Sequence, residues 1–466
     1  MRFDVFATRL LLVAAAALAA TSVVQTDFWW LLRAGRDIWR TGRVSLVEHY
    51  SYTAAGRFWP NHEWLWEAVA YGVHQVGGMP LLAVLVAATV VTTLLVVLRL
   101  SPATGYVVPA VLVLVLPLLS VSWTMRPQVT SLLLFAVTML LLARERYLLV
   151  PAVFLIWANL HAQVVMGGVL LAASLLVAVV RWARFRRPVE RGRVTRLGAA
   201  TAASALATLA TPLGPRLWAY VADANGRPGQ QAIAEWHNAF EVNGPVLLFW
   251  AVVATAVVSC VRRRDRLSSW SAQVPVAAAL AMAPLAILAV RNIPFLALAA
   301  APLLMTTLEF TPARPISNVP HARVWLGAIG TVALCCVVGA WTVLPAGLGW
   351  RPVPPALATA VRQCPGHLFN GYGTGAALVW WVPETKVFVD NRQDPYPARV
   401  IDTLFELTPA TYPQVFARYG IRCAFLAPGN PLGPTLRRDG WQNAYAGDEG
   451  SVWWAPAEPR ATAATE

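Results

Sequence analysis

The segment QVVMGGVLLAASLLVAVVRWARFRR, residues 163–187, determines the class of fold. Residues 163–180 carry no charge, and about 18–20 apolar residues are the length that an α-helix needs to cross the hydrocarbon core of a bilayer. The basic run RWARFRR that follows is typical of a helix end on the cytoplasmic side. Similar apolar blocks recur along the chain, so we predict an α-helical polytopic membrane protein.

Composition supports this class. Of 466 residues, 57% are hydrophobic and 13% are charged, and the mean hydropathy is +0.55. Soluble domains have about twice that share of charged residues. The net charge of +14 comes almost entirely from arginine, since Lys386 is the only lysine. Many of these arginines lie in short loops between apolar blocks, where they mark topology, so we exclude a nucleic-acid-binding protein.

Apolar blocks predict eleven spans. The first resembles a signal peptide in its basic start and Ala-rich end, but the blocks that follow favour an uncleaved helix. Alternating the spans so that arginine-rich loops are cytoplasmic places the N-terminus inside and residues 346–466 outside a bacterial cell membrane. We predict a transmembrane domain over 1–345 and an extracytoplasmic α/β domain over 346–466. The spans are 6–24, 81–98, 105–123, 129–146, 147–160, 163–181, 197–213, 244–261, 272–290, 294–310 and 325–345.

The first outer loop, residues 25–80, breaks the charge rule. It holds Arg33, Arg36, Arg40, Arg43 and Arg57 on the predicted outer side, which suggests that these arginines bind anionic groups. Two of its stretches, 28–39 and 62–76, have the pattern of helices that lie flat at the membrane interface.

Residues 346–466 alternate short β-rich runs with helical patterns. Strands are expected over 386–390, 423–427 and 452–454, and helices near 396–407 and 410–419. Cys364 and Cys423 both lie in this region, and the sequence leaves open whether they form a disulfide.

Unusual polar residues gather on the predicted outer face. Ionisable groups at membrane depth are costly and usually face a cavity or one another, so together they predict one outward-facing site. Each also has a structural interpretation: a helix cap, a side chain that reaches the headgroups, an interhelical hydrogen bond or a solvated charge. The residues are Asp27, Arg126, Asn159, His161, Glu235 and Arg291.

Several motifs resemble a group of bacterial multi-pass membrane proteins. This group is similar to the GT-C superfamily of membrane glycosyltransferases, which use polyprenyl-phosphate-linked sugars. The resemblance covers nearly the whole chain. It rests on residues 27–30 (DFWW), 33–36 (RAGR), 51–53 (SYT), 56–65 (GRFWPNHEWL), 126–128 (RPQ), 159–161 (NLH), 235–236 (EW), 369–373 (FNGYG) and 387–392 (VFVDNR).

The resemblance implies roles for individual residues. Asp27 would be the catalytic base or a ligand of a divalent metal ion. Many members carry paired acidic residues, whereas Gln25 stands two positions before Asp27, so Glu48 is the obvious second carboxylate. Substrate contacts would come from Arg126, Asn159, His161, Glu235, Arg291, Asn61, His62 and Glu63. In the outer domain they would come from Tyr372, Asp390 and Arg392, which otherwise are turn and strand-end residues.

The resulting hypothesis is a glycosyltransferase that moves a sugar from a polyprenyl-phosphate carrier to an acceptor on the outer face. A transporter or flippase of lipid-linked saccharides is the alternative from another class, although no pair of broken helices in matching halves is visible. A non-catalytic assembly protein is a third. The sequence contains no nucleotide-sugar, P-loop or zinc motif, and it leaves the sugar and the acceptor open.

Overall fold

The computed structural model describes residues 2–22, 24–223, 234–241, 246–309, 319, 321–343 and 352–456. The chain divides into two compact units. The helical unit comprises Met1–Gln25, His62–Asn225 and Gln230–Trp350, and the α/β unit comprises mainly Thr26–Asn61 and Arg351–Glu466. The predicted domain boundary at 345/346 lies outside the described residues.

Each of the eleven predicted spans overlaps a helix of the helical unit. Six helices in the described part of the chain are long and apolar enough to cross a membrane: those that begin at Phe3, Trp64, Val164, Trp270 and Ala322, and the one that begins at Ile293, counted with the 3₁₀ turn Val290–Asn292 before it. The fold is therefore that of a mostly helical protein with several membrane-length helices. The helices are α1 Phe3–Ala20, α3 Trp64–Leu98, α4 Val107–Ser120, α5 Gln128–Ala143, α6 Val150–Leu160, α7 Val164–Phe185, α8 Pro188–Ala207, α9 Arg216–Ala222, α10 Val246–Arg262, α11 Trp270–Leu288, α12 Ile293–Thr307 and α13 Ala322–Val343.

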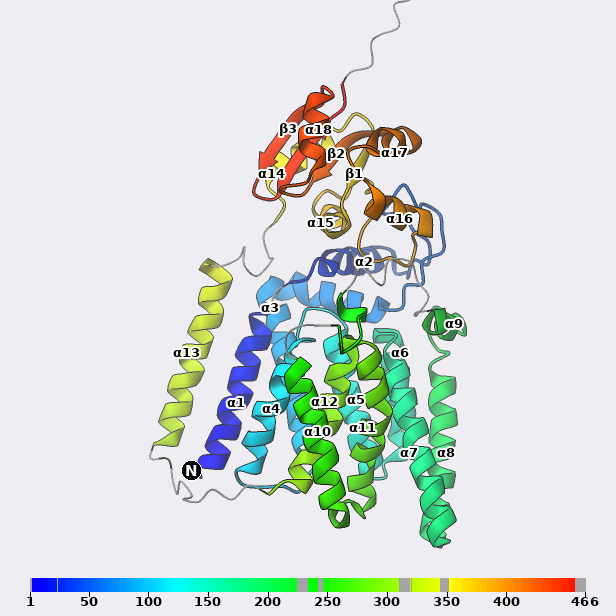
Figure 1. Cartoon of the computed structure of the whole chain (residues 1–466), viewed down its shortest axis with the longest axis vertical. Coiled ribbons are helices and arrows are strands. Elements are labelled where there is room, and N and C mark those ends of the chain that lie inside the picture. Colours follow the sequence, from blue (N-terminus) through cyan, green and yellow to red (C-terminus); the bar gives the residue numbers. More distant parts are fainter. Residues whose placement is uncertain are drawn as a thin grey trace, which may run out of the picture. The chain divides into compact units, whose positions relative to one another are not determined.

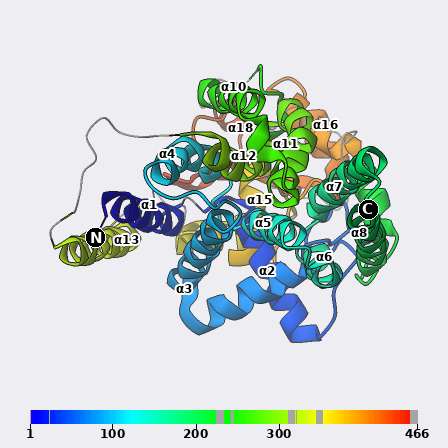
Figure 2. The same cartoon turned by 90° about the horizontal axis from the view of Figure 1, so that it is seen from below.

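Helix α12 forms the centre of this unit. It is buried along most of its length and packs against α4, α10 and α11, whereas α13 lies at the periphery beside α1 (Figure 2). Since lipid-facing helices expose apolar residues, the exposed Val324, Val332 and Leu334 of α13 fit a membrane-facing position.

Helix α3 contains a sharp break. Gly77 and Gly78 have non-helical backbone angles, and Gly78 adopts a positive φ of 61° that glycine tolerates best. The break separates an initial segment, which matches the predicted interfacial helix 62–76, from the apolar part that follows. In the initial segment Val69 and Val76 are exposed, whereas Trp66, Glu67 and Ala70 are buried, so a charged residue shares the buried face of this segment with apolar ones.

Arginine-rich connections lie together at one end of the helical unit. Arg193 pairs with Glu145 at 2.7 Å, and Arg181 pairs with Glu190 at 2.7 Å and donates to the carbonyl of Ser268 at 2.8 Å. Arg144 donates to the carbonyl of Arg99, and Arg263 pairs with Glu309. We call this the basic end. In Figure 1 the N-terminus and the α7–α8 and α10–α11 connections lie at this end of the unit.

The α/β unit is built on a four-stranded mixed sheet in the order β1-β2-β4-β3. Strand β1 pairs parallel with β2, and β4 pairs antiparallel with β2 and β3. The strands are β1 His367–Asn370, β2 Ile421–Leu426, β3 Gln442–Gly447 and β4 Gly450–Trp454, and the helices are α2 Asp27–Thr41, α14 Pro355–Arg362, α15 Tyr372–Trp381, α16 Ala398–Glu406, α17 Tyr412–Tyr419 and α18 Leu432–Arg438.

Two of the three expected strands are present, and one is not. Residues 386–390 form only a single bridge, between Ser51 and Val387. The side chain of Asn370 takes the place of a strand partner: it accepts from the amide of Phe388 at 2.8 Å and donates to the carbonyl of Val389 at 2.7 Å. At Gly375 a Cβ would lie 2.0 Å from the same carbonyl, so this close approach requires glycine.

Residues 26–61 are an integral part of the α/β unit. Helix α2 packs against α15. The amide of Tyr52 donates to the carbonyl of Val387, and the Tyr52 hydroxyl donates to that of Leu368. Ala54 belongs to the hydrophobic core, together with Phe388 and Phe416. The sequence therefore builds this unit from two segments that are about 300 residues apart.

A disulfide joins Cys364 and Cys423 in this unit, with a Cα–Cα distance of 5.9 Å. It links the segment before β1 to β2. The question that the sequence left open is thus answered by the structure in favour of a disulfide.

Candidate active site

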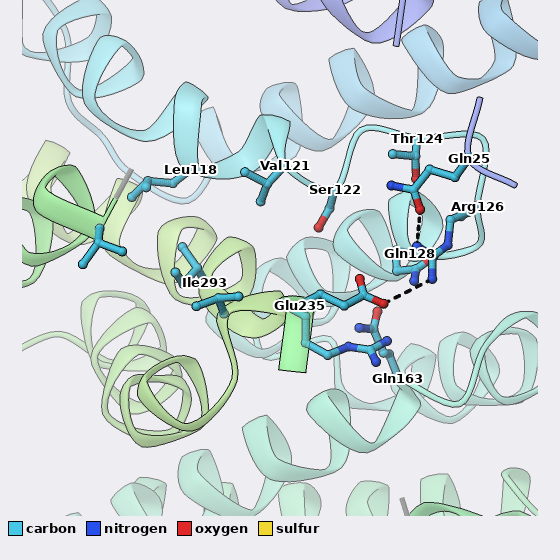
Figure 3. A pocket seen from close by; sticks show the side chains of 13 residues that line it. Gln25, Leu118, Val121, Ser122, Thr124, Arg126, Gln128, Gln163, Glu235 and Ile293 are labelled. Atoms are coloured by element: carbon cyan, nitrogen blue, oxygen red, sulfur yellow. Dashed lines mark hydrogen bonds and ion pairs between the residues drawn. The ribbon is translucent and has the colours of Figure 1, made fainter. Parts of the chain in front are cut away.

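A cavity of about 240 Å³ lies within the helical unit. One side is apolar, with Leu118, Val121, Val246 and Ile293, and the other carries polar side chains. The polar residues are Gln25, Ser122, Thr124, Arg126, Gln128, Gln163, Glu235 and Arg291. Figure 3 shows Gln25, Arg126 and Glu235 converging on the same space.

Two arginines dominate the charge of this cavity. Arg126 precedes α5, where it is held by a hydrogen bond to Gln25 and by an ion pair with Glu235 at 3.6 Å (Figure 3). Arg291 lies in a 3₁₀ turn, Val290–Asn292, with its guanidinium 4.3 Å from the ring centre of Trp236. Two guanidinium groups face one carboxylate here, which gives the cavity the electrostatics of an anion site.

This cavity lies at the end of the unit opposite the basic end. Arg126 lies two residues before the start of α5, and Arg144 immediately follows the helix. A helix of this length extends about 24 Å. Likewise Gln163 precedes α7 and Arg186 follows it. The loop arginines therefore lie at one end of the helical unit, and the cavity arginines lie at the other end.

A second polar cluster involves His62, Glu63 and His161. Nε2 of His62 lies 3.1 Å and Nε2 of His161 lies 3.3 Å from the same oxygen, Oε1 of Glu63. Nδ1 of His161 contacts the hydroxyl of Ser131 at 2.9 Å, and Ser131 also accepts a hydrogen bond from the indole of Trp157. Burial alone would raise the pKa of Glu63, but its contacts with His62 and the charge of Arg126 lower it to about 2.

Asn159 has a bridging position in the same unit. Its side-chain oxygen accepts from the indole of Trp64 at 2.8 Å, and its amide donates to the carbonyls of Leu155 and Ala210. These hydrogen bonds tie α6 to the start of α3 and to the residues after α8.

The two predicted catalytic carboxylates have different surroundings in the α/β unit. Asp27 is half-buried at the first position of α2, where it accepts a hydrogen bond from the side chain of Asn391. Glu48 has no side-chain exposure; it pairs with Arg392 at 2.6 Å and accepts from the amides of Tyr50 and Ser51.

Arg392 is the centre of a buried ion network. Its guanidinium also pairs with Asp390 at 2.6 Å and lies over the rings of Trp59 and Tyr50, 4.7 and 4.9 Å from their centres. Burial alone would lower the pKa of Arg392, but Asp390 and Glu48 hold it well above the usual value. This arrangement has the form of a structural ion network, because the charges are paired with one another and sealed from solvent.

Tyr372 and Asn61 complete the predicted set. The Tyr372 hydroxyl donates to the carbonyl of Asn391, the residue beside Arg392. Asn61 is buried, and its backbone N–H donates to the carbonyl of Trp59.

Solved structures share this architecture. The apo oligosaccharyltransferase of Archaeoglobus fulgidus aligns with 90% of this chain and 69% of its own, with a TM-score of 0.56 and 13% identity. ArnT from Cupriavidus metallidurans, bound to undecaprenyl phosphate, aligns with 97% of this chain and 99% of its own, with a TM-score of 0.53 and 13% identity. The same archaeal enzyme, AglB, with an inhibitory peptide and a dolichol-phosphate, gives a TM-score of 0.53 at 12% identity over 89% of this chain and 69% of its own. These neighbours are members of the GT-C superfamily.

The chain has a GT-C fold. No family model and no curated protein matches its sequence, so the similarity lies in the arrangement of the elements. The GT-C resemblance predicted from the motifs is confirmed at the level of fold.

Within this GT-C fold, some site residues were not among those predicted. Gln25, Gln128 and Gln163 line the cavity beside the predicted arginines. In the sequence Gln25 stands two positions before Asp27 in place of a second acidic residue, and Gln128 belongs to the RPQ motif. The position of each glutamine next to a predicted polar residue, at the end of an apolar block, was the signal that could have identified it.

Proposed function

We propose that this chain is a glycosyltransferase that takes a sugar from a polyprenyl-phosphate carrier at the outer face of the membrane. The observation that carries this proposal is the cavity lined by Arg126 and Arg291, at the end of the helical unit opposite the basic end. In support, the neighbours with this fold are glycosyltransferases, and they have been solved with undecaprenyl phosphate and with dolichol-phosphate.

The cavity has the chemistry that such a donor needs. A polyprenyl phosphate has an anionic head and an apolar chain, and the cavity has arginines on one side and Leu118, Val121 and Ile293 on the other. When the bond from sugar to phosphate breaks, negative charge develops on the departing phosphate oxygen. Guanidinium groups that are already in position stabilise that charge.

For the acceptor we retain Asp27 as the proposed general base. It follows Gln25 by two residues in the chain, and a carboxylate can remove the proton of an acceptor hydroxyl as that oxygen attacks the sugar. Glu48 receives a different proposed role, because its buried pairing with Arg392 suits a residue that supports the α/β unit.

Turnover of a labelled donor tests this function. Purified full-length protein, mixed with envelope lipids and glycans as acceptors, is expected to move radiolabel from polyprenyl-phosphate sugars into a new product. If the protein instead moved intact labelled donor across the membrane of a vesicle and transferred no sugar, this result would contradict the glycosyltransferase hypothesis and favour a flippase.

Binding of the lipid phosphate should depend on the cavity arginines. Arg126→Gln and Arg291→Gln each remove charge-assisted hydrogen bonds, so we expect undecaprenyl phosphate to bind about 10–100-fold more weakly. The control is Arg262→Gln, which changes an exposed arginine at the end of α10. Unchanged affinity in both cavity variants would mean that these arginines only reach the headgroups.

The proposed membrane orientation makes a separate prediction. Because the loops of the basic end are rich in arginine, we expect that end to be cytoplasmic, and the Cys364–Cys423 disulfide favours an oxidising compartment for the α/β unit. Reporter fusions after Arg191 and after Pro355 should therefore report opposite compartments. Activity of the same reporter at both positions would overturn the orientation.

A further inference from the structure

The cluster of His62, Glu63 and His161 has the composition of a metal site. Two imidazole nitrogens and one carboxylate oxygen lie within 4.8 Å of one another. Two histidines and one glutamate are a ligand set that zinc uses in sites where a fourth position stays open for water or substrate. His62 and Glu63 are adjacent, but His161 follows about 100 residues later, so the sequence shows no ligand spacing that reveals the set.

The distances between the ligand atoms fit a metal ion. Bonds of the usual zinc length place tetrahedral ligand atoms about 3.4 Å apart. The nitrogens of His62 and His161 lie 3.1 and 3.3 Å from Oε1 of Glu63. These two distances are close to the tetrahedral separation, and the two imidazole nitrogens lie within 4.8 Å of each other.

The backbone explains how adjacent residues converge. Glu63 precedes α3 with φ −118° and ψ 11°, outside the helical conformation. Two neighbouring residues inside a regular helix would point about 100° apart. At this position, by contrast, the side chains of His62 and Glu63 turn toward each other.

A supporting shell holds one ligand in place. Ser131, fully buried in α5, contacts Nδ1 of His161 at 2.9 Å and accepts the Trp157 indole N–H at 2.9 Å. When Nδ1–H of His161 donates to Ser131, the Nε2 lone pair faces Glu63. Metal-binding histidines commonly have such a hydrogen bond on their second nitrogen.

We infer that His62, Glu63 and His161 bind a zinc ion at the end of the helical unit that carries the arginine cavity. The hydroxyl of Tyr220, 3.5 Å from Nε2 of His62, offers a further polar group beside the centre. Imidazole ligands favour zinc, nickel, copper or iron over magnesium and calcium. This inference stands independently of the transferase reaction.

Metal content tests the inference directly. Full-length protein without a histidine tag is stripped with EDTA, dialysed against Zn²⁺ and analysed by plasma mass spectrometry. We expect about one zinc per chain in the wild type, and visible absorption of tetrahedral Co²⁺ after substitution with cobalt. The control His321→Gln, which changes an exposed histidine, should bind zinc as the wild type does.

Variants of the ligands distinguish this site from zinc bound elsewhere. His161→Gln and Glu63→Gln should weaken zinc binding by more than about 100-fold, and Ser131→Ala by about 10–100-fold, since it removes only the support of a ligand. Ser131→Ala keeps the test valid if a ligand variant fails to fold. Wild-type protein without zinc above background, or variants that bind zinc equally well, would overturn the inference.

Discussion

Replacing Asp27 by Asn is expected to lower sugar transfer by about 10²–10⁴-fold, the usual contribution of a general base. The side chain keeps its size, and Asn at the start of α2 still accepts a hydrogen bond from Asn391 and still suits a helix N-terminus. Only the negative charge is lost. The measurement is transfer from labelled polyprenyl-phosphate sugar by purified variant and wild type.

A structural role for Asp27 predicts a different result. If Asp27 only favours the start of α2, its charge stabilises the first turn by about 0.3–1 kcal/mol, and transfer by Asp27→Asn should stay within a few-fold of wild type. Asp402→Asn, which changes an exposed carboxylate in α16, is the matched control and should leave transfer unchanged. A nearly active Asp27→Asn would end the catalytic assignment, whereas lost transfer with normal membrane insertion supports it.

The helical part of this fold was accessible from the sequence because its signals are local. The length and hydropathy of a block such as 163–181 predict a membrane-spanning helix. The observed helix α7 begins and ends within a few residues of these predicted bounds. The arginine loops could be grouped because charge biases the side of the membrane at each loop separately. Contacts such as Arg193–Glu145 then join loops that had been assigned to one side.

The α/β unit was less accessible because its contacts are non-local. Residues 26–61 carry the Trp-rich pattern of an interfacial helix, and that pattern gives no sign that α2 packs against α15. The run 386–390 has strand composition, but Asn370 takes the hydrogen bonds that a strand would have made. The composition of a segment indicates its tendency to form a strand. Whether it pairs in a sheet depends on residues that are distant in the sequence.

The same limit applies to the site. The sequence marks each candidate polar residue separately, either as unusual at membrane depth or through the family resemblance, and the structure separates these residues into groups with different partners. Arg126 and Arg291 line one cavity, whereas Glu48 and Arg392 neutralise each other in the interior of the α/β unit. Both kinds of residue look alike in sequence, because burial of a charge is costly whether it serves chemistry or structure.

The buried network around Arg392 gives the second large expected effect. Arg392→Met keeps much of the side-chain volume but leaves the carboxylates of Glu48 and Asp390 buried without their cation. Removing one partner of a buried ion pair typically costs about 3–5 kcal/mol. That loss is large compared with the total stability of a domain, about 5–15 kcal/mol. We expect faster hydrogen exchange throughout the amides of β2 and β4.

Arg437→Met is the control for loss of an arginine in the same unit. Arg437 is exposed and lies over the ring of Trp453, 5.6 Å from its centre. Exposed substitutions usually change stability by less than about 0.5 kcal/mol, so exchange in the strands should stay close to that of wild type. Equal protection in Arg392→Met and Arg437→Met would contradict the structural importance of the network.

The variant Glu48→Gln distinguishes a structural role of Glu48, the second predicted catalytic carboxylate, from a catalytic role. The glutamine oxygen still accepts from the amides of Tyr50 and Ser51, but its NH₂ group faces the guanidinium of Arg392, so a donor meets a donor. Arg392 keeps Asp390, and we expect an intermediate loss of about 1–3 kcal/mol, with transfer reduced only as far as the unit unfolds. If Glu48 were catalytic, Glu48→Gln would instead abolish transfer and leave hydrogen exchange in β2 and β4 unchanged. In that case the reaction would depend on the negative charge of Glu48, whereas the stability of the α/β unit would not.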